Sequence, residues 1–462
     1  MLCDGRLLAW GISDCPATNS WHSFQGGNAN ASVSLDSQPD GAGGHYVAGF
    51  AADDFISSPR RAFEGAAGTL NVFLLRLDSN GSVIWGTYLG RSNGSGGAQL
   101  AVGEEGVTLL SNASAAFGTP INAYQGGNDI LVARVSPEGD LAWHTYQGTA
   151  GNDTGAGIFR RSDGGFWITG GMQNPALGAA GTSLIVHPNP GADAGFAQRL
   201  GPNGNAISHS FFGGVNSTLF LGLAGTASDE LYAFGNANNA LSGAYPNTIV
   251  NYSGGASDDA LLVKLSADGA YLYHTFQGEN SGVQRFNGGA VQSDGSIILA
   301  GFTAAGYGTP LSPFAGGSSD FLVSRYSAEG ALLWLTFVGG AGADVIDTPA
   351  VGAARNGGAW VGGTSDASFG SAIAPFSHGG GGANHGVVYG VDVNGVVGAP
   401  LFFGTAATTI TTTGITETCE GGLLITNRTN GSYGSRPIVP FAGGALAGLL
   451  IRLDVGLQLG TL

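Results

Sequence analysis

The sequence predicts an all-β protein, a seven-bladed β-propeller with four antiparallel strands in each blade. Three observations predict this fold. A phrase of two strands joined by a glycine-containing turn recurs seven times, successive copies lie roughly sixty residues apart, and a second, fainter strand pair separates them. This period is too long for a solenoid of helical hairpins, and it fits four-stranded blades with long loops.

The repeated phrase is clearest at 314–340, FAGGSSDFLVSRYSAEGALLWLTFVGG. It contains a turn-rich lead-in, a strand, a tight turn, a second strand and a Gly-Gly exit. The copies at 252–278 and 124–148 have the same order, and weaker copies lie at 71–90, 193–213, 386–404 and 441–462. The turn glycines are Gly81, Gly139, Gly204, Gly269, Gly330, Gly395 and Gly456.

The fainter strand pair reads GGAVQSDGSIILAGF at 288–302, with its turn at Asp294-Gly295. Turns of this kind favour glycine because the backbone adopts positive φ. One unit departs from the pattern, with Asp229-Glu230 where the glycine is expected. The corresponding glycines of other units are Gly106, Gly164, Gly357 and Gly421.

Composition supports a folded β protein and narrows the classes of partner. Glycine makes up 84 of 462 residues without a collagen period, and only 10% of residues are charged. The net charge of −16 argues against binding to nucleic acid or to anionic membrane surfaces. The chain has no apolar run long enough to span a membrane.

The three cysteines, Cys3, Cys15 and Cys419, lack the spacing of a metal site. One disulfide with a spare thiol fits their number, with Cys3–Cys15 and a link from the N-terminus to Cys419 as the alternatives. The first residues lack the basic start and apolar core of a signal peptide. Three explanations stay open: the chain is a mature or trimmed product, it is exported by another route, or it stays inside the cell.

We expect residues 1–30 to supply an outer strand with an inserted loop, ahead of a propeller at 31–462. Residues 4–12 resemble the last strand of a blade, and WHSFQGG at 21–27 resembles WHTYQG at 143–148. Since residues 456–462 also read as a final strand, one outer strand is surplus, and pairing within its own ring is favoured over addition to a neighbouring molecule. The expected blades are about 31–90, 91–148, 149–213, 214–278, 279–340, 341–404 and 405–462.

Two segments interrupt the repeats. Residues 182–193 are expected to lengthen one loop, and residues 371–384, with the glycine string HGGGGAN, to form a surface loop.

The lead-ins GTPINAYQGG, GAYPNTIVNYSGG, GTPLSPFAGG and SRPIVPFAGG share a proline, an aromatic residue and Gly-Gly. Together with the strand–turn–strand phrase that follows them, they resemble the SBBP type of bacterial β-propeller repeat. The resemblance covers nearly the whole chain and is strongest in blades 2, 4 and 5. It implies the propeller fold and an exported or cell-surface location. It implies no reaction, and no catalytic residue is carried over.

A basic residue recurs on the third strand of the repeat. A ring of cation sites is one interpretation, but a repeated charge on one strand face usually packs along the surface and pairs locally, so we expect a structural role. Asp129, Asp259 and Asp320 recur five residues earlier and are expected to pair between blades. The repeated basic residues are Arg76, Arg134, Arg199, Lys264, Arg325 and Arg452.

Aromatic and histidine residues recur on the outer strand. Trp85, Trp143 and Trp334 occupy one repeat position and are expected in the blade core, although an exposed aromatic could stack on a sugar. The neighbouring histidines lie in different blades, too far apart to share a metal ion, and are expected to face solvent. They are His22, His144, His209 and His274.

The innermost strands are mostly small and apolar, with Asp36 and Glu417 isolated among them. No paired acids and no nucleophile motif occur there, so we expect no enzymatic activity and no cofactor. The expected function is that of an exported structural or adhesive module that binds other proteins, including copies of itself, with carbohydrate binding as the alternative. Several N-x-[ST] sequons fall in predicted turns, where Asn, Gly and Ser are favoured in any case.

Overall fold

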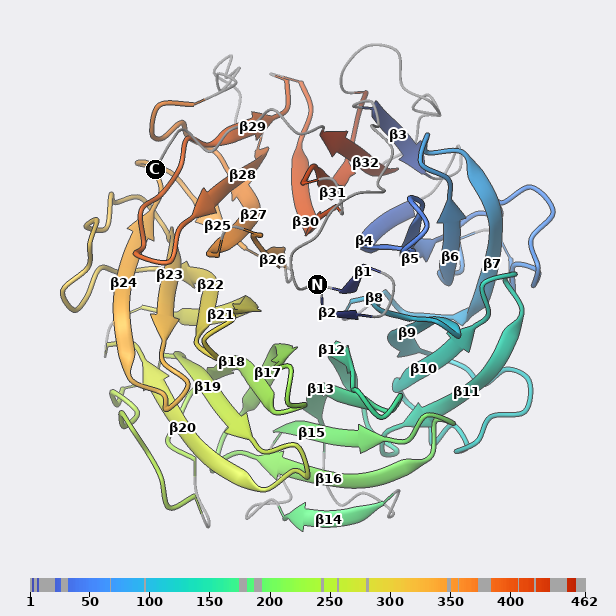
Figure 1. Cartoon of the computed structure of the whole chain (residues 1–462), viewed down its shortest axis with the longest axis horizontal. Coiled ribbons are helices and arrows are strands. Elements are labelled where there is room, and N and C mark those ends of the chain that lie inside the picture. Colours follow the sequence, from blue (N-terminus) through green and yellow to red (C-terminus); the bar gives the residue numbers. More distant parts are fainter. Residues whose placement is uncertain are drawn as a thin grey trace.

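The computed structural model shows a ring of seven small, mainly antiparallel sheets, a seven-bladed β-propeller. Figure 1, viewed down the shortest axis of the molecule, shows the sheets arranged around a common centre. Among the described residues no helix occurs. The structure describes residues 2–3, 6–7, 21–25, 32–66, 68–94, 97–173, 181–186, 193–241, 245–255, 257–279, 282–346, 350–355, 357–372, 384–405, 407–418, 421–432 and 447–453.

The first three blades follow the chain from the innermost to the outermost strand. Blade 1 contains β4 (Ser32–Pro39), β5 (His45–Ala51), β6 (Asn71–Leu77) and β7 (Val83–Arg91). Blade 2 contains β8 (Gln99–Gly103), β9 (Gly106–Ala113), β10 (Asp129–Val135) and β11 (Leu141–Gln147). Blade 3 contains β12 (Thr154–Arg160), β13 (Phe166–Met172), β15 (Ala194–Leu200) and β16 (Ala206–Phe212).

Blades 4 to 6 repeat this order. Blade 4 contains β17 (Thr218–Gly225), β18 (Leu231–Ala237), β19 (Asp259–Leu265) and β20 (Tyr271–Gln277). Blade 5 contains β21 (Gln284–Val291), β22 (Ile297–Thr303), β23 (Asp320–Tyr326) and β24 (Leu332–Val338). Blade 6 has an interrupted inner strand, β25 (Asp344–Val345) and β26 (Val351–Ala353), followed by β27 (Ala359–Ser365), β28 (His385–Val391) and β29 (Leu401–Phe403).

Blade 7 combines the two ends of the described chain. It contains β30 (Ile410–Glu417), β31 (Leu423–Thr429) and β32 (Ala447–Leu453), and its outermost strand is β3 (Trp21–Gln25). Trp21 pairs with Arg452, the same register in which Trp143 pairs with Arg134 in blade 2. The N-terminal segment therefore pairs within its own ring, while residues 456–462 lie outside the described residues.

Two segments differ from the repeat. Within residues 4–12, β2 (Arg6–Leu7) pairs with β1 (Leu2–Cys3) in a separate two-stranded sheet, and the other residues of that segment lie outside the described ranges. Residues 182–193 are not wholly a loop, because β14 (Thr182–Ile185) runs parallel to β16 and adds a fifth strand to blade 3. Neither strand could be read from the repeat, because both lie in insertions without a counterpart in other blades.

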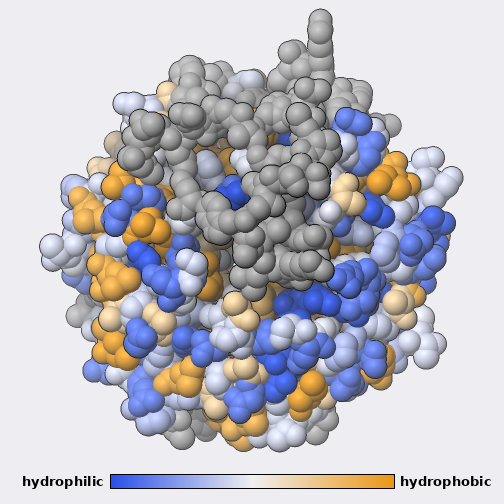
Figure 2. All heavy atoms as spheres, in the orientation of Figure 1, coloured by the Kyte–Doolittle hydropathy of each residue, from blue (hydrophilic) through white to orange (hydrophobic). Residues whose placement is uncertain are grey.

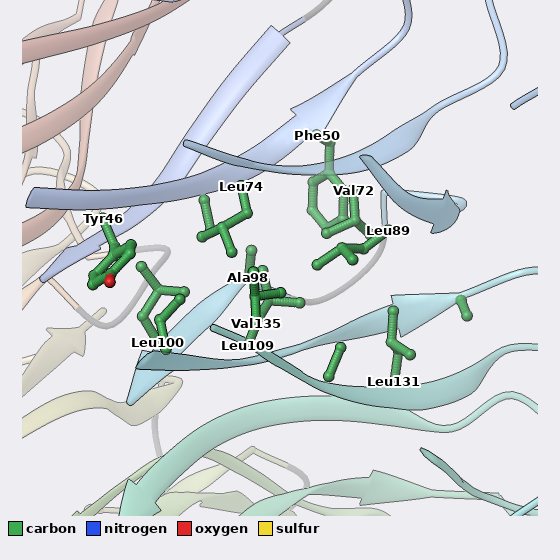
Figure 3. Close-up of a cluster of buried hydrophobic side chains, with 14 of the residues drawn as sticks. Tyr46, Phe50, Val72, Leu74, Leu89, Ala98, Leu100, Leu109, Leu131 and Val135 are labelled. Atoms are coloured by element: carbon green, nitrogen blue, oxygen red, sulfur yellow. The ribbon is translucent and has the colours of Figure 1, made fainter. Parts of the chain in front are cut away.

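The hydrophobic core lies between neighbouring blades. The second and third strands are almost fully buried on both faces, which is why they read as continuous apolar runs. Figure 3 shows the cluster between blades 1 and 2, where Phe50, Leu74 and Leu89 of blade 1 approach Leu109 and Leu131 of blade 2. Each blade thus covers the apolar face of the next.

The predicted turn glycines that lie within the described ranges have the expected backbone conformation. Gly139 and Gly330, between third and fourth strands, have φ of 95° and 89°. Asp229 occupies the one position without glycine and still has φ of 64°, a left-handed conformation that Asp tolerates better than most residues. The described units therefore share a positive φ at this turn position, even where the residue is not glycine.

Short extended segments cover the outer edge of several blades. In blade 2 the backbone N–H of Ile121 donates to the carbonyl of His144 (2.9 Å), and in blade 5 Leu311 N–H donates to Leu335 O (2.8 Å). Arg60–Arg61 and Thr248–Val250 make equivalent bonds to the outer strands of blades 1 and 4. These edge segments satisfy backbone groups that would otherwise be free to pair with another chain.

Candidate functional site

The repeated basic and aromatic residues meet at the seams, the interfaces between one blade and the next. At the seam between blades 1 and 2, Nη1 of Arg76 and Nε1 of Trp85 both donate to the carbonyl of Pro137, each at 2.9 Å. Pro137 lies in the turn between the third and fourth strands of blade 2. Nη2 of Arg76 also contacts Asp40 at 2.8 Å, so the guanidinium joins both blades.

The seam between blades 5 and 6 repeats this arrangement. Nη1 of Arg325 and Nε1 of Trp334 donate to the carbonyl of Val393 at 2.7 and 2.8 Å. Nη2 of Arg325 contacts Asp294 at 2.7 Å, and its Nε donates to the Ser296 hydroxyl. One turn carbonyl of the following blade is therefore the common acceptor for both donors.

The seam between blades 4 and 5 uses different side chains in the same positions. Nζ of Lys264 donates to the carbonyl of Ala328 at 3.0 Å and contacts Glu230 at 3.1 Å, above the ring of Tyr232. Burial opposes the charge on Lys264, but Tyr232 and Glu230 outweigh burial and raise its pKa. Tyr273 replaces the tryptophan, and its buried hydroxyl interacts with Tyr232 of the same blade and makes no bond to the turn carbonyl of blade 5.

The other members of the basic set also lie at seams, which agrees with a structural role. Arg134 is 8% exposed and its guanidinium lies over the rings of Trp143 and Phe166, from blades 2 and 3. Nη1 of Arg452 contacts Nε2 of His45 at 2.9 Å across the seam between blades 7 and 1. Arg199 donates to the carbonyl of Asp268 at 3.3 Å.

Sequence reasoning missed Arg161, whose Nη1 donates to the carbonyl of Ala267 at 2.8 Å in the seam between blades 3 and 4. Arg161 lies in the first turn of its blade, outside the repeat position of the other basic residues. Its only sequence signal was the neighbouring RR pair at 160–161. The acceptor, a carbonyl of the turn before Gly269, belongs to the same turn position as Pro137 and Val393.

The repeated aspartates were expected to pair between blades, and the hydrogen bonds that each accepts come from its own blade. Each accepts a backbone N–H from the lead-in of its own blade: Gln125 to Asp129 (2.6 Å), Ser253 to Asp259 (2.7 Å) and Ala315 to Asp320 (2.6 Å). Their position at the first residue of the third strand directs them to the lead-in loop. They hold the glycine-rich loop against the blade.

The histidines do not face solvent, and that expectation was wrong. His144, His209 and His274 are 3%, 5% and 3% exposed, because the edge segments cover them. Nε2 of His144 lies 2.7 Å from the carbonyl of Phe117 and its ring stacks on Phe117. Burial lowers the pKa of His274 to about 4, so this imidazole is neutral at pH 7. The side chain of His22 lies outside the described residues.

The two inner carboxyls are used in seams. Oδ2 of Asp36 accepts the backbone N–H of Leu100 from blade 2 at 2.8 Å, and burial raises its pKa to about 7. Oε2 of Glu417 accepts the backbone N–H of Arg355 at 2.9 Å and the indole N–H of Trp360 at 3.1 Å. Both side chains join neighbouring blades through their inner strands.

A shallow groove of about 520 Å³ lies on the rim at the seam between blades 4 and 5. Its walls are the edge segment of blade 4, the beginning of β20 and the turn at Ala328 and Glu329. Lys264, the single lysine of the chain, and Tyr273 lie at its inner side. The groove therefore occurs where Lys and Tyr replace Arg and Trp.

Exposed aliphatic side chains follow the outer edges of the blades. Figure 2 shows hydrophobic residues distributed around the periphery of one face. We name as the outer-edge belt twelve exposed residues, 38% to 75% accessible, on outer strands, edge segments and their turns in blades 1 to 6. They are Val83, Ile84, Ile121, Leu184, Val186, Ile207, Ile249, Val250, Leu311, Leu332, Leu333 and Val396.

Some residues singled out in the sequence lie outside the ranges that the structure describes. Cys15 and Cys419 are not described, and the side chain of Cys3 is not, so their pairing stays a prediction. Within the described ranges no three His, Cys, Asp or Glu side chains converge as metal ligands. The same ranges contain no long apolar helix of the kind that crosses a membrane.

Comparison with known proteins adds little beyond the architecture. No family model and no curated protein matches the sequence. Solved structures that resemble it include a protein of unknown function from Dyadobacter fermentans (10% identity, TM-score 0.38, covering 95% of this chain and 100% of that one). Another is the parainfluenza virus 5 hemagglutinin-neuraminidase ectodomain (10% identity, TM-score 0.37, covering 98% and 86%). At this similarity neither carries an argument about function.

Proposed function

We propose that the protein is a non-enzymatic, exported structural or adhesive module that binds other protein molecules through its outer rim. Copies of itself are the first candidate partner. The outer-edge belt is the observation that carries the proposal, because exposed apolar residues that recur along a surface are typical of protein–protein contact sites. The SBBP-type repeat and the exported location are part of this proposal and rest on the sequence resemblance alone.

The chemistry of the belt favours a protein partner over a glycan. Sugar sites rely on exposed aromatic rings, whereas every member of the outer-edge belt is aliphatic. Among the described residues the tryptophans that were candidates for stacking are occupied in seams: Trp85 and Trp334 each donate to a turn carbonyl. Carbohydrate binding therefore stays the second candidate.

The structural role of the polar groups supports a non-enzymatic module. Asp36 and Glu417, the carboxyls nearest to the axis in the sequence pattern, are engaged by backbone and indole donors of neighbouring blades. The charged seam residues have protein partners at hydrogen-bonding distance. A rigid ring with covered strand edges is suited to presenting a surface of fixed shape.

Light scattering over a range of protein concentrations tests the proposal. The wild type is expected to associate, and a variant with Ile84, Leu332 and Leu333 changed to Ser is expected to stay monomeric. Val215→Ser is the matched control, because Val215 is 66% exposed but lies between blades, outside the belt. A wild type that is monomeric at all concentrations would contradict self-assembly, and a glycan array would then test the second candidate.

A further inference from the structure

Two seams bring buried aspartates of neighbouring blades together. Asp129 begins β10 of blade 2 and Asp153 precedes β12 of blade 3, while Asp320 begins β23 of blade 5 and Asp344 begins β25 of blade 6. All four are 0% exposed. A Cβ added at Gly148 would lie 2.8 Å from Oδ1 of Asp129 and 2.7 Å from Oδ2 of Asp153.

The second pair has the same geometry. A Cβ added at Gly339 would lie 2.9 Å from Oδ1 of Asp320 and 2.5 Å from Oδ2 of Asp344. In each pair one oxygen from each blade therefore approaches the same glycine. A side chain at either glycine would enter the space between the two carboxyls, so the seam requires glycine at both positions.

The aspartate at the start of the third strand in each pair has one oxygen without a donor among the described residues. Oδ2 of Asp129 and Oδ2 of Asp320 accept backbone N–H groups, but Oδ1 of each accepts no hydrogen bond from the described residues. These are the oxygens that face the partner carboxyl. A buried charged oxygen without a donor is unfavourable, and a second carboxylate beside it makes the ionised pair still less favourable.

The surrounding ionisable groups do not neutralise the pairs. Asp153 acts on Asp129, Asp193 acts on Asp153, and both Asp320 and Asp366 act on Asp344. No arginine or lysine is among the groups that shift these four carboxyls. The other titratable neighbours are Tyr124 and Tyr146 beside the first pair, Tyr389 beside the second, and His385 two strands from Asp344 in the same row.

The pKa values agree with the geometry. Burial, reinforced by Asp153, raises the pKa of Asp129 to about 6. Burial raises the pKa of Asp344 to about 6 against the hydrogen bonds from Ser365 and Gly340 that lower it, and Asp320 and Asp366 add to the rise. An isolated aspartate titrates about two pH units lower, so each pair binds a proton well above the range of an exposed carboxyl.

We infer that each of these two seams holds one proton between its two aspartates, which makes the stability of the ring dependent on pH. The proton comes from solvent, and the protonated carboxyl donates its O–H to the carboxylate of the neighbouring blade. Near neutral pH the proton is lost and two carboxylates face each other across the seam. The seams between blades 2 and 3 and between blades 5 and 6 therefore strengthen as the pH falls from about 7 to about 5.

Two of the seams without the pair serve as internal comparisons. At the seam between blades 4 and 5, Gln284 replaces the second aspartate beside Asp259 and Gly278. In blade 1, Asn71 occupies the position of Asp129, and its side chain accepts the N–H of Glu64 and donates to the carbonyls of Glu64 and Thr69. An amide is thus compatible with this position of the fold.

The test compares the wild type with the double variant Asp129→Asn, Asp320→Asn by urea unfolding from pH 8 to pH 5. The wild type is expected to gain stability as the pH falls relative to the variant, with a difference of about one bound proton per seam in the pH slope. An infrared difference spectrum should show a protonated-carboxyl band that appears near pH 6 and is lost in the variant. Equal slopes and an unchanged band would overturn the inference.

A variant that adds a carboxyl pair tests the same inference even if the double variant fails to fold. Gln284→Glu creates a third carboxyl pair at the seam between blades 4 and 5, and should add about one proton to the slope over the same pH range. If this variant folds but adds no proton uptake, the shared-proton explanation is wrong even where the double variant is unstable.

Discussion

The seam between blades 5 and 6 and the seam between blades 4 and 5 use different side chains to bind the turn carbonyl of the following blade. In the first, Arg325 and Trp334 both donate to the carbonyl of Val393. In the second, Lys264 alone donates to the carbonyl of Ala328, and the hydroxyl of Tyr273 interacts with Tyr232 of its own blade instead. The shared element is the turn carbonyl of the following blade, and the donors vary.

This difference shows which part of the repeat determines the packing. A turn carbonyl cannot be removed by substitution, so it remains available as an acceptor, and Arg76, Arg325 and Lys264 each donate to it from the preceding blade. The rim groove of about 520 Å³ lies at the seam between blades 4 and 5, with Lys264 and Tyr273 in its lining. This seam is also joined by Tyr232, whose hydroxyl donates to the carbonyl of Gly295 at 2.8 Å.

The largest expected effect concerns the turn glycine that the aromatic ring covers. Gly330 has φ of 89°, and a Cβ there would lie 2.5 Å from the Tyr273 ring. We expect Gly330→Ala to lower the free energy of unfolding by about 3 kcal/mol, from left-handed strain and overpacking together. Gly295→Ala is the control: φ is 80°, but the nearest atom lies at 3.5 Å, so only about 1 kcal/mol should be lost in urea unfolding. Equal losses would show that the ring contact is unimportant.

The next expected effect is a pH dependence of stability, and it concerns the residue that follows Tyr273 in blade 4 and Trp334 in blade 5. Blade 4 has His274 there, and blade 5 has Leu335. Because burial lowers the pKa of His274 to about 4, the unfolded chain binds the proton first, and this residue removes stability as the pH falls from about 6.5 towards 4. We expect His274→Leu to abolish a pH-dependent loss on the order of 2 kcal/mol in thermal or urea unfolding. If the variant keeps the wild-type pH dependence of stability, another group is responsible for it.

A third prediction compares the two aromatic residues directly. Trp334→Phe removes the donor to Val393, and we expect it to cost about 1 to 2 kcal/mol in the free energy of unfolding. Tyr273→Phe removes a buried hydroxyl that makes no bond to the turn carbonyl and interacts only with Tyr232 of its own blade, so the loss of stability should be smaller than in Trp334→Phe. Equivalent losses in both variants would mean that Tyr273 makes a bond equal to that of the indole.

The smallest expected effect is the exchange of the basic residue. Lys264→Arg should change stability by less than about 0.5 kcal/mol, because Ala328 and Glu230 remain in reach of a guanidinium. Arg325→Lys should cost about 1 kcal/mol, since a lysine cannot contact Val393, Asp294 and Ser296 together. Urea unfolding of the two variants measures this asymmetry, and a costly Lys264→Arg would contradict it.

Repetition explains how much could be predicted from the sequence. A strand pair joined by a glycine turn, such as 320–338, reads clearly because its strands are buried on both faces and its turn requires positive φ. Arg325 and Trp334 could be recognised as structural because their counterparts recur at the same register. The histidines were misplaced because the segments that cover them, such as 248–250, have irregular sequences and no strand pattern of their own.

The architecture of this protein could be predicted from its residues: seven units of two hairpins, positive-φ turns, and apolar strands that a neighbouring blade must cover. The contacts across the seams could not, because they join residues about sixty positions apart through the packing of one blade on the next. The tertiary structure decided them, and it also decided how the ring closes. Trp21 pairs with Arg452 as other tryptophans pair with their arginines, a register that depends on bringing the two ends of the chain together.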